Sequence, residues 1–328
     1  MSASVIVIAM DRKSFIVNAV VSVIKSKMLI EKNIEIIVVK NFNDADIDEK
    51  LTSFGVKNIF SKNMGLGHKI IESLQFSNAE FILFLEDDDL FIDTKLRRFF
   101  DILNRFPDIS MYHNSYENMN SSENPSLQRK ALNPKHDILI EQSDIKNVEN
   151  IDLAMRKGAT HNLSSMAVRR DILLSFSEIL KQITFSLDHV LFLISIESDK
   201  PIFIDHSITT KINVHQSTSN PPLDSEYIKA RKAFLLRAKW ELELLSSYLR
   251  TPLSKRACSK MLLDIEILLN ILLPGVKGRY MNRFCLYLQH SIKEKSIITI
   301  ALVTLIPFSI FLKIFHIELY LLLAKLSR

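Results

Sequence analysis

Cysteine is scarce in this chain: Cys258 and Cys285 are the only two among 328 residues. Two cysteines cannot supply the disulfide framework that stabilises small secreted domains, so we expect a reducing compartment. The N-terminus enters an apolar run directly, without the basic and then apolar segments of a secretory signal, so we expect no such signal. The sequence also lacks internal repeats and low-complexity tracts.

Glycine is scarce as well, with six residues, and none lies between Ala9 and Ser14. A metal-dependent nucleotidyltransferase built on an α/β sheet would need a glycine-rich, basic loop after its first strand to hold phosphates. The missing glycines disfavour that class of enzyme.

A strong excess of one charge is absent too. The net charge is +5, the basic residues are spread along the chain, and no nucleic-acid motif occurs. We therefore expect no nucleic-acid partner and only a weak attraction to phosphate or membrane surfaces. With 47% apolar and 24% charged residues, a chain of this length forms a globular protein with a full core.

The most informative stretch runs from Glu80 to Asp89 and reads Glu-Phe-Ile-Leu-Phe-Leu-Glu-Asp-Asp-Asp. Its five apolar residues, 81–85, predict a strand buried on both faces. Four carboxylates follow, and they repel one another unless they face water or hold a cation. Ligands bind at the carboxyl ends of strands in open α/β sheets, and Mg²⁺ and Mn²⁺ take oxygen ligands there. The plain alternative is a charged loop.

Strands and helices alternate over the first 110 residues, which predicts a parallel, right-handed βαβ sheet. The strands are expected at 4–8, 34–39, 57–60, 81–85 and 109–113. Helices are expected after Ser14 as an N-cap, at 47–54, after Gly65, and after Asp93 as an N-cap.

The second half continues with helices and strands that are less regular. We expect helices at 148–157, 170–180 and 190–196, and strands at 161–168, 202–204 and 208–214. The predicted strand 161–168 contains Ser164 and Ser165, and Asp188-His189 opens the helix 190–196.

Six short motifs in this order resemble those of the family 2 glycosyltransferases, nucleotide-sugar enzymes with the GT-A fold. The resemblance covers about 4–219 and rests on the following segments: Ser4-Val-Ile-Val-Ile with Asp11-Arg12, Glu35-Ile-Ile-Val-Val, Gly65-Leu-Gly-His-Lys, Leu85-Glu-Asp-Asp-Asp, Leu187-Asp188-His189, and His215. It implies a Rossmann-like, mostly parallel sheet flanked by helices.

The resemblance also implies roles for individual residues. The metal ligands would be Asp88, Glu86 and His215, holding Mn²⁺ or Mg²⁺, with Glu86 either on the metal through water or on the ribose. Asp188 would be the catalytic base. The donor would contact Ala9, Asp11, Arg12, Asn41, Gly67, Lys69 and Asp87. The acceptor side would include Asp89, Ser165 and His189.

Each of these residues also has a structural alternative. His215 would be an ordinary histidine at a strand end, and Asp188 would cap the helix that follows it. Asp87 or Asp89 would cap the next turn, and the glycine pair would form a plain turn. The basic residues Arg129, Lys130 and Lys135 are further candidates for the diphosphate, or are simply solvated.

Two positions depart from the family pattern. The second strand usually ends in aspartates, one of which reads the nucleobase, whereas Lys40 and Asn41 stand there in this sequence. Asn41 or Asp44 would have to substitute. The acidic motif begins with Glu86 in place of aspartate, which keeps the same oxygen chemistry.

Asn220-Pro221-Pro222 marks the clearest domain boundary. We expect a catalytic domain at 1–220, with a nucleotide-sugar half at 1–112 and an acceptor half at 113–220. A helical domain at 221–294 and apolar helices at 295–328 follow. Ser296–Leu312 has 17 uncharged residues between basic flanks, which favours helices lying in a membrane surface. A buried hairpin, packed on the protein or on a second subunit, is the alternative.

These observations predict an inverting, metal-dependent glycosyltransferase at the cytoplasmic membrane face. It would move a sugar from a nucleotide-sugar donor to a glycan or a polyprenyl-linked acceptor. The competing hypotheses are a non-catalytic scaffold of the same fold and the nucleotidyltransferase disfavoured above. Membrane lipid would be a partner, and homo-oligomerisation stays open.

Overall fold

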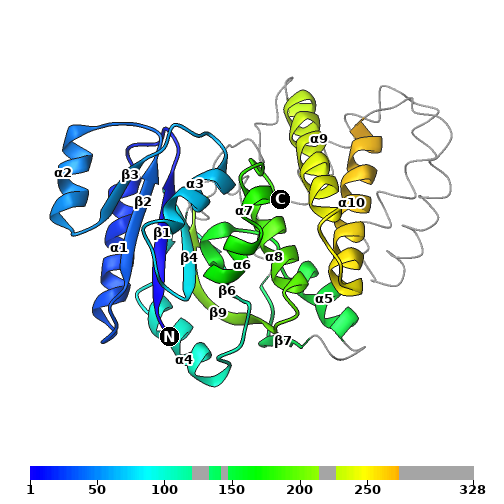
Figure 1. Ribbon diagram of the computed structural model, residues 1–328, viewed down its shortest axis with the longest axis horizontal. Helices are drawn as coiled ribbons and strands as arrows, with labels where there is room; N and C mark the ends of the chain where they lie inside the picture. Colours follow the sequence, from blue (N-terminus) through cyan, green and yellow to red (C-terminus); the bar gives the residue numbers. More distant parts are fainter. Residues whose placement is uncertain (120–132, 142–146, 214–226, 273–328) are drawn as a thin grey trace. The chain divides into compact units, whose positions relative to one another are not determined.

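The computed structural model describes residues 1–119, 133–141, 147–213 and 227–272 (Figure 1). The chain divides into two compact units. The first unit comprises Met1–Asn120, Ala131–Asn213 and Leu244–Ala257, and the second comprises Ser121–Lys130, Val214–Glu243 and Cys258–Arg328.

The first unit is built on one sheet with the strand order β3-β2-β1-β4-β8-β6-β9-β5, and β7 pairs with β9. The first four strands in this order are parallel to one another, as the alternation of strands and helices predicts. They are β1 (Ala3–Ala9), β2 (Glu35–Lys40), β3 (Lys57–Phe60) and β4 (Phe81–Glu86).

The other half of the sheet corrects the expectation of a mostly parallel sheet. The strand β8 (Met166–Arg169) is antiparallel to both β4 and β6 (Met111–Asn118). The long strand β9 (Ile202–Ile212) is parallel to β6. Two short strands that the sequence analysis missed, β5 (Leu90–Phe91) and β7 (Ile138–Ile140), are antiparallel to β9. The sheet is therefore mixed.

Among the described residues of the first unit, eight α-helices precede β9 along the chain. They are α1 (Ile16–Met28), α2 (Ala45–Ser53), α3 (Leu66–Leu74), α4 (Lys95–Arg105), α5 (Asn147–Arg156), α6 (Arg170–Ser175), α7 (Ser177–Leu180) and α8 (Leu187–Glu197).

Several local expectations were wrong. Phe15 and Thr94, not Ser14 and Asp93, occupy the N-cap positions of α1 and α4, and neither makes a side-chain cap. The predicted strand 161–168 is instead the 3-10 helix η2 (Leu163–Ser165) followed by β8. Periodicity alone did not separate a short strand from a tight helical turn.

The strands β1 and β4 are buried on both faces, as the continuous apolar runs predict. Alternate residues such as Val5 and Leu83 join a core with the inner faces of α1 and α4. Figure 1 shows α3, α6 and α8 on the other face of the sheet. The carboxyl ends of β1 and β4 therefore open between two helical layers.

The described part of the second unit is helical, in agreement with the sequence. It contains most of α9 (Tyr227–Ser246) and of α10 (Pro252–Leu272). Leu235 and Leu269 form its small core, and Lys239 pairs with Glu266 at 3.0 Å. Cys258 is buried, as expected of a core residue. The rest of the predicted helical domain, 273–294, the predicted apolar helices at 295–328, and Cys285 lie outside the described residues.

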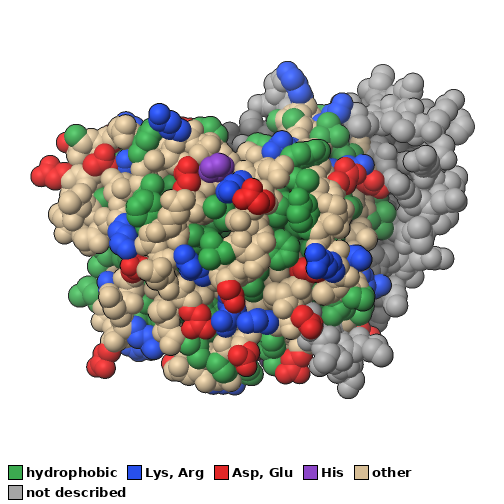
Figure 2. All heavy atoms as spheres, in the orientation of Figure 1, with side chains coloured by type: hydrophobic (Ala, Val, Ile, Leu, Met, Phe, Trp, Pro, Cys, Tyr) green, Lys and Arg blue, Asp and Glu red, His purple; other side chains and the backbone are tan. Residues whose placement is uncertain are grey.

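Among the described helices, none is long and apolar enough to cross a membrane. Figure 2 shows acidic and basic side chains interspersed over the face in view.

The start of α3 touches the segment after α7 backbone to backbone. The Gly67 N–H donates to the carbonyl of Ile183 at 3.1 Å. A Cβ atom added at Gly67 would lie 1.9 Å from the carbonyl oxygen of Leu180. Glycine is therefore required here by close packing, since the backbone oxygen cannot turn away as a flexible side chain would.

We predict that Gly67→Ala lowers the free energy of unfolding by about 2 kcal/mol or more, because α3 must separate from α7. Thermal unfolding of the purified chain would show a midpoint lower by roughly 5 °C. Gly65→Ala is the matched control, since its Cβ would lie 3.3 Å from the nearest backbone oxygen. Equal midpoints for the two variants would contradict the packing argument.

Candidate active site

The acidic stretch lies where β1 and β4 end side by side, with Ile8 and Glu86 in register. The Asp87 N–H donates to the carbonyl of Ile8 at 3.1 Å. In return, the Met10 N–H donates to Asp87 Oδ2 at 3.2 Å. These reciprocal bonds join the loop after β1 to the carboxylates after β4.

Arg12 bridges two of these carboxylates. Its guanidinium donates to Asp87 Oδ1 at 2.5 Å and to Asp88 Oδ2 at 2.7 Å. The Asp87 side chain is 0% exposed and the Asp88 side chain 5%, whereas Arg12 is 34% exposed. Charge-assisted bonds of this kind are strong where water is excluded.

Asp89 joins three separate segments. Its Oδ2 accepts from the Ser164 hydroxyl at 2.6 Å, and its Oδ1 accepts from the Asn213 N–H at 2.9 Å. The Ser164 oxygen also accepts from the Glu86 N–H at 2.9 Å. Because both Asp89 oxygens are bonded, this side chain holds η2 and the end of β9 against β4. Its predicted role on the acceptor side stays a prediction.

Lys95, which the sequence analysis missed, supports η2 from the first turn of α4. Its buried ammonium donates to Asn114 Oδ1 at 2.6 Å, to the Ser164 carbonyl at 2.7 Å and to Thr210 Oγ1 at 2.7 Å. Burial lowers the pKa of Lys95 well below its usual value. A lysine that reaches residues 19 to 115 positions away leaves no signal in a sequence.

The carboxylates are short of compensating positive charge. Burial raises the pKa of Asp87 to about 7 although Arg12 opposes the shift, and burial together with Asp88 raises that of Asp89 to about 7. Desolvation also raises the pKa of Glu86 well above its usual value, and Asp89, Asp88 and Asp188 add to the effect. Oxygen-rich, negatively charged groups at a ligand-binding edge fit a hard divalent cation.

Asn41 fixes the loop after β1. Its Oδ1 accepts from the Asp11 N–H at 3.0 Å, and its Nδ2 donates to Asp11 Oδ1 at 2.9 Å. These bonds hold Asp11 at a φ of 60°, an uncommon left-handed conformation for a residue other than glycine. The Asn41 Nδ2 also lies 3.5 Å from Met64 Sδ.

The other residues around the predicted nucleobase site have structural partners. Asp44 caps α2 by accepting from the Ile47 N–H at 3.3 Å, and it pairs with Lys13. Lys40 is buried and pairs with Asp48 at 2.9 Å. Lysine at the end of β2 is thus explained by contacts within the fold.

Of the remaining predicted donor residues, Ala9 ends β1 beside Lys40 and is buried. The buried ammonium of Lys69 donates to the Asn63 carbonyl, and burial lowers its pKa. Lys135 is exposed. His215, Arg129 and Lys130 lie outside the described residues.

Asp188 lies in the first turn of α8, with Ser186 at the N-cap position. Its Oδ1 accepts from the N–H of His189 at 2.9 Å and contacts His189 Nδ1 at 3.0 Å. Desolvation acts to raise the pKa of Asp188, but His189 and then His161 hold it below its usual value. The Asp188 side chain is 24% exposed, so an ionised carboxylate reaches the surface of the site.

The negative charge of Asp188 is one of the causes that raise the pKa of Glu86, after burial, Asp89 and Asp88. The rings of His161 and His189 lie 5.5 Å apart. His113, buried below, donates from Nε2 to the His161 carbonyl at 3.0 Å, which leaves its Nδ1 without a partner among the described residues. Burial lowers the pKa of His113 to about 4.

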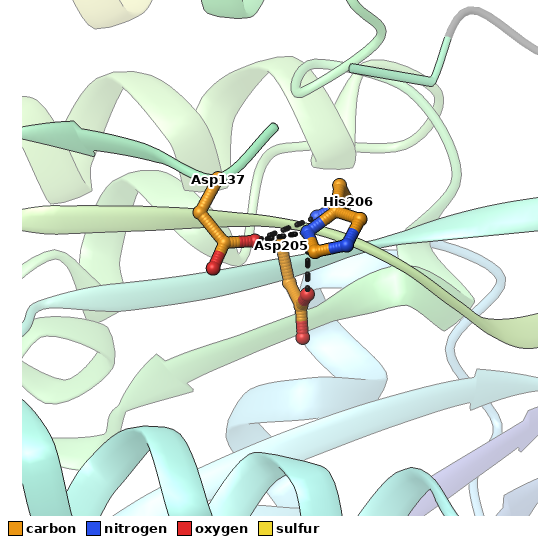
Figure 3. Close-up of side chains that lie close together, drawn as sticks. All are labelled: Asp137, Asp205 and His206. Atoms are coloured by element: carbon orange, nitrogen blue, oxygen red, sulfur yellow. Dashed lines mark hydrogen bonds and ion pairs between the residues drawn. The ribbon is translucent and has the colours of Figure 1, made fainter. Parts of the chain in front are cut away.

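A second group of possible metal-binding side chains is separate from this site and was not anticipated. Asp137, Asp205 and His206 place one ligand atom each within 4.8 Å of one another (Figure 3). Asp205 accepts from Arg98 Nε at 2.8 Å and from the Tyr112 hydroxyl at 2.8 Å, and His206 Nδ1 lies 2.6 Å from Asp137. With Arg98 already neutralising Asp205, we interpret the group as an ion-pair network.

A model of the family described as Glycosyl transferase family 2 matches residues 4–174, which is more than half of the chain. The chain belongs to glycosyl transferase family 2. The match includes β1, the loop with Arg12, and the acidic end of β4, and it confirms the resemblance that the motifs indicated. Family membership supports the assignment of the chain as a glycosyltransferase.

Solved structures agree in fold. The structure of S. aureus TarS 1–349 in complex with UDP is 13% identical and has a TM-score of 0.56. The match covers 92% of this chain and 90% of that chain. The complex of the same fragment with UDP-GlcNAc has a TM-score of 0.55 at 13% identity, with the same coverage. At this identity the likeness shows the fold. No curated protein matches the sequence.

Within the family pattern, the structure accounts for one departure. Asn41, which stands where relatives carry an aspartate, uses its amide to hold Asp11. The roles predicted for the site residues stay predictions. What the structure adds is that Arg12 bridges Asp87 and Asp88, and that the charge of Asp188 contributes to the raised pKa of Glu86.

The adjacent serines of η2 give a matched test of how this site is held. Both are buried, but Ser164 bonds to Asp89 and to Glu86, whereas the Ser165 Oγ has no partner among the described residues. We predict that Ser164→Ala costs about 1–3 kcal/mol of stability, because it leaves buried polar groups unpaired. Ser165→Ala should be close to neutral.

Chemical denaturation of both variants measures the difference. If Ser165→Ala retains stability but loses catalytic activity, the acceptor-side role predicted for Ser165 gains support. Equal destabilisation by the two substitutions would contradict the assignment of Ser164 as the bonded partner.

Proposed function

We propose that the chain is an inverting, metal-dependent glycosyltransferase that moves a sugar from a nucleotide-sugar donor to a glycan or lipid-linked acceptor. The observation that carries the proposal is the cluster of buried carboxylates at the end of β4, two of which Arg12 bridges. A scaffold protein has no use for four like charges in a partly dehydrated place, because holding them there costs stability.

Asp88 and Glu86 would hold the cation, with His215 as a further ligand expected from the sequence alone. When bound, a divalent cation stabilises the negative charge that grows on a departing diphosphate. Arg12 adds a second positive group beside the same carboxylates, 34% exposed and within reach of an incoming anion.

Asp188 would accept the proton of the attacking acceptor hydroxyl. A base must be ionised before the reaction, and the contacts from His189 and His161 favour the ionised form. Attack by one activated nucleophile on the face opposite the leaving group inverts the anomeric centre, by the logic that applies to inverting glycosidases.

The decisive experiment measures turnover with Mn²⁺, a panel of nucleotide sugars and candidate acceptors, detecting release of nucleoside diphosphate. We predict that Asp88→Ala abolishes release, because the cation loses its principal carboxylate. Asp93→Ala is the control, since Asp93 is an exposed acid five residues further along. Turnover by the wild type that persists in excess EDTA would exclude the metal-dependent mechanism.

A second prediction concerns Asp188 and reports on the acceptor. Removing a general base should lower the rate by about two to four orders of magnitude when the acceptor is a sugar hydroxyl, so Asp188→Asn should be nearly inactive. A lipid phosphate is already ionised and needs no base. A folded Asp188→Asn variant with nearly normal kcat would therefore indicate a polyprenyl phosphate acceptor. Circular dichroism would show whether the variant is folded.

A further inference from the structure

Arg12 occupies the side of the acidic cluster where a cation would be held. Its guanidinium bonds to Asp88 Oδ2 at 2.7 Å and to Asp87 Oδ1 at 2.5 Å. Asp88 is also the side chain to which we assign the cation. The Arg12 guanidinium and the cation would therefore contact the same carboxylate. The arrangement differs from a surface ion pair, because the two carboxylates are 0% and 5% exposed.

The backbone presents Arg12 to these carboxylates. Asp11 is held in a left-handed conformation by its two bonds to Asn41. The Arg12 N–H then donates to the Met10 carbonyl at 2.7 Å, which completes a tight turn. The Met10 N–H is bonded to Asp87 in turn. The backbone of the loop is therefore fixed at several points, and it starts the Arg12 side chain beside the carboxylates.

Charge balance gives this contact a consequence. A guanidinium supplies one positive charge that is permanently present, and it neutralises part of a cluster of four carboxylates. A divalent cation supplies two charges to the same oxygens. The two cannot both make close contact with Asp88 Oδ2 without repelling each other, since like charges a few ångströms apart in a dehydrated site interact strongly.

We propose that Arg12 is an internal counter-cation that competes with the divalent metal for Asp88. On this proposal, which rests on the function proposed above, the guanidinium stabilises the metal-free site and weakens the binding of the metal alone. Arg12 is 34% exposed, so its side chain has room to leave the carboxylate when the metal enters. The metal affinity of the free protein would then be set partly by Arg12.

The test compares Mn²⁺ affinity in the full chain and in three variants, using electron paramagnetic resonance of free Mn²⁺ without any nucleotide. Arg12→Gln should bind Mn²⁺ about tenfold more tightly than the wild type, a change of about 1.4 kcal/mol. Arg12→Lys, which keeps the charge but lacks the planar guanidinium fork that spans the two carboxylates, should lie between them. Lys13→Gln is the matched control, because its partner is Asp44 at 3.1 Å and not the acidic cluster.

We expect the Mn²⁺ affinity of Lys13→Gln to stay within about twofold of the wild type. That result would show that the gain in Arg12→Gln comes from the lost contact with Asp88 and not from the lower surface charge. Thermal unfolding gives an independent measurement, since a ligand stabilises the native state according to its affinity. Addition of Mn²⁺ should raise the midpoint of Arg12→Gln more than that of the wild type, and the metal-free midpoints would show whether each variant folds.

Equal or weaker Mn²⁺ binding by a folded Arg12→Gln variant would overturn the proposal, as would the absence of Mn²⁺ binding in all four proteins. Failure of the proposed function is distinguishable. If Arg12→Gln gains affinity but the wild type releases no nucleoside diphosphate from any nucleotide sugar, the competition stands and the glycosyltransferase assignment falls. If the wild type turns over with metal and the affinities are equal, only the competition fails.

Discussion

Four carboxylates crowded at the end of β4 impose the constraint on which the rest of the site depends. Such a group is costly to hold out of water, and the structure offsets part of the cost with bonds to Asp87, Asp88 and Asp89. Arg12 reaches over from the end of β1, Ser164 from η2, and the Asn213 N–H from the end of β9. Three loops are thus ordered by one acidic motif.

The sequence predicts the centre of this arrangement well, because local patterns determine it. A continuous apolar run followed by carboxylates indicates a buried strand that ends at a ligand-binding edge, and β4 with Glu86 fits that description. The glycine pair at the start of α3 and the position of Asp188 at the start of α8 are likewise local signals. The parallel orientation of β3, β2, β1 and β4 follows from the alternation of strands and helices.

Long-range contacts account for what the sequence could not predict. Whether β8 runs parallel or antiparallel to β4 depends on its place in the finished sheet, which no window of residues records. In the sequence Lys95 is an ordinary helical lysine. Its bonds to Asn114 and Thr210 form only when the fold places those distant residues beside it. The two bonds between the Asn41 amide and Asp11 likewise depend on β1 and β2 ending side by side.

The close approach at Gly67 has a mechanical consequence. Residues 1–112 and residues 113–220 are the halves that the family resemblance assigns to donor and acceptor, and here α3 of the first half touches Leu180 and Ile183 of the second without an intervening side chain. At this point the two segments can separate only by breaking the hydrogen bond from Gly67 to Ile183. A shift of α3 that left the segment after α7 in place would therefore break that bond, and a side chain at position 67 would force such a shift.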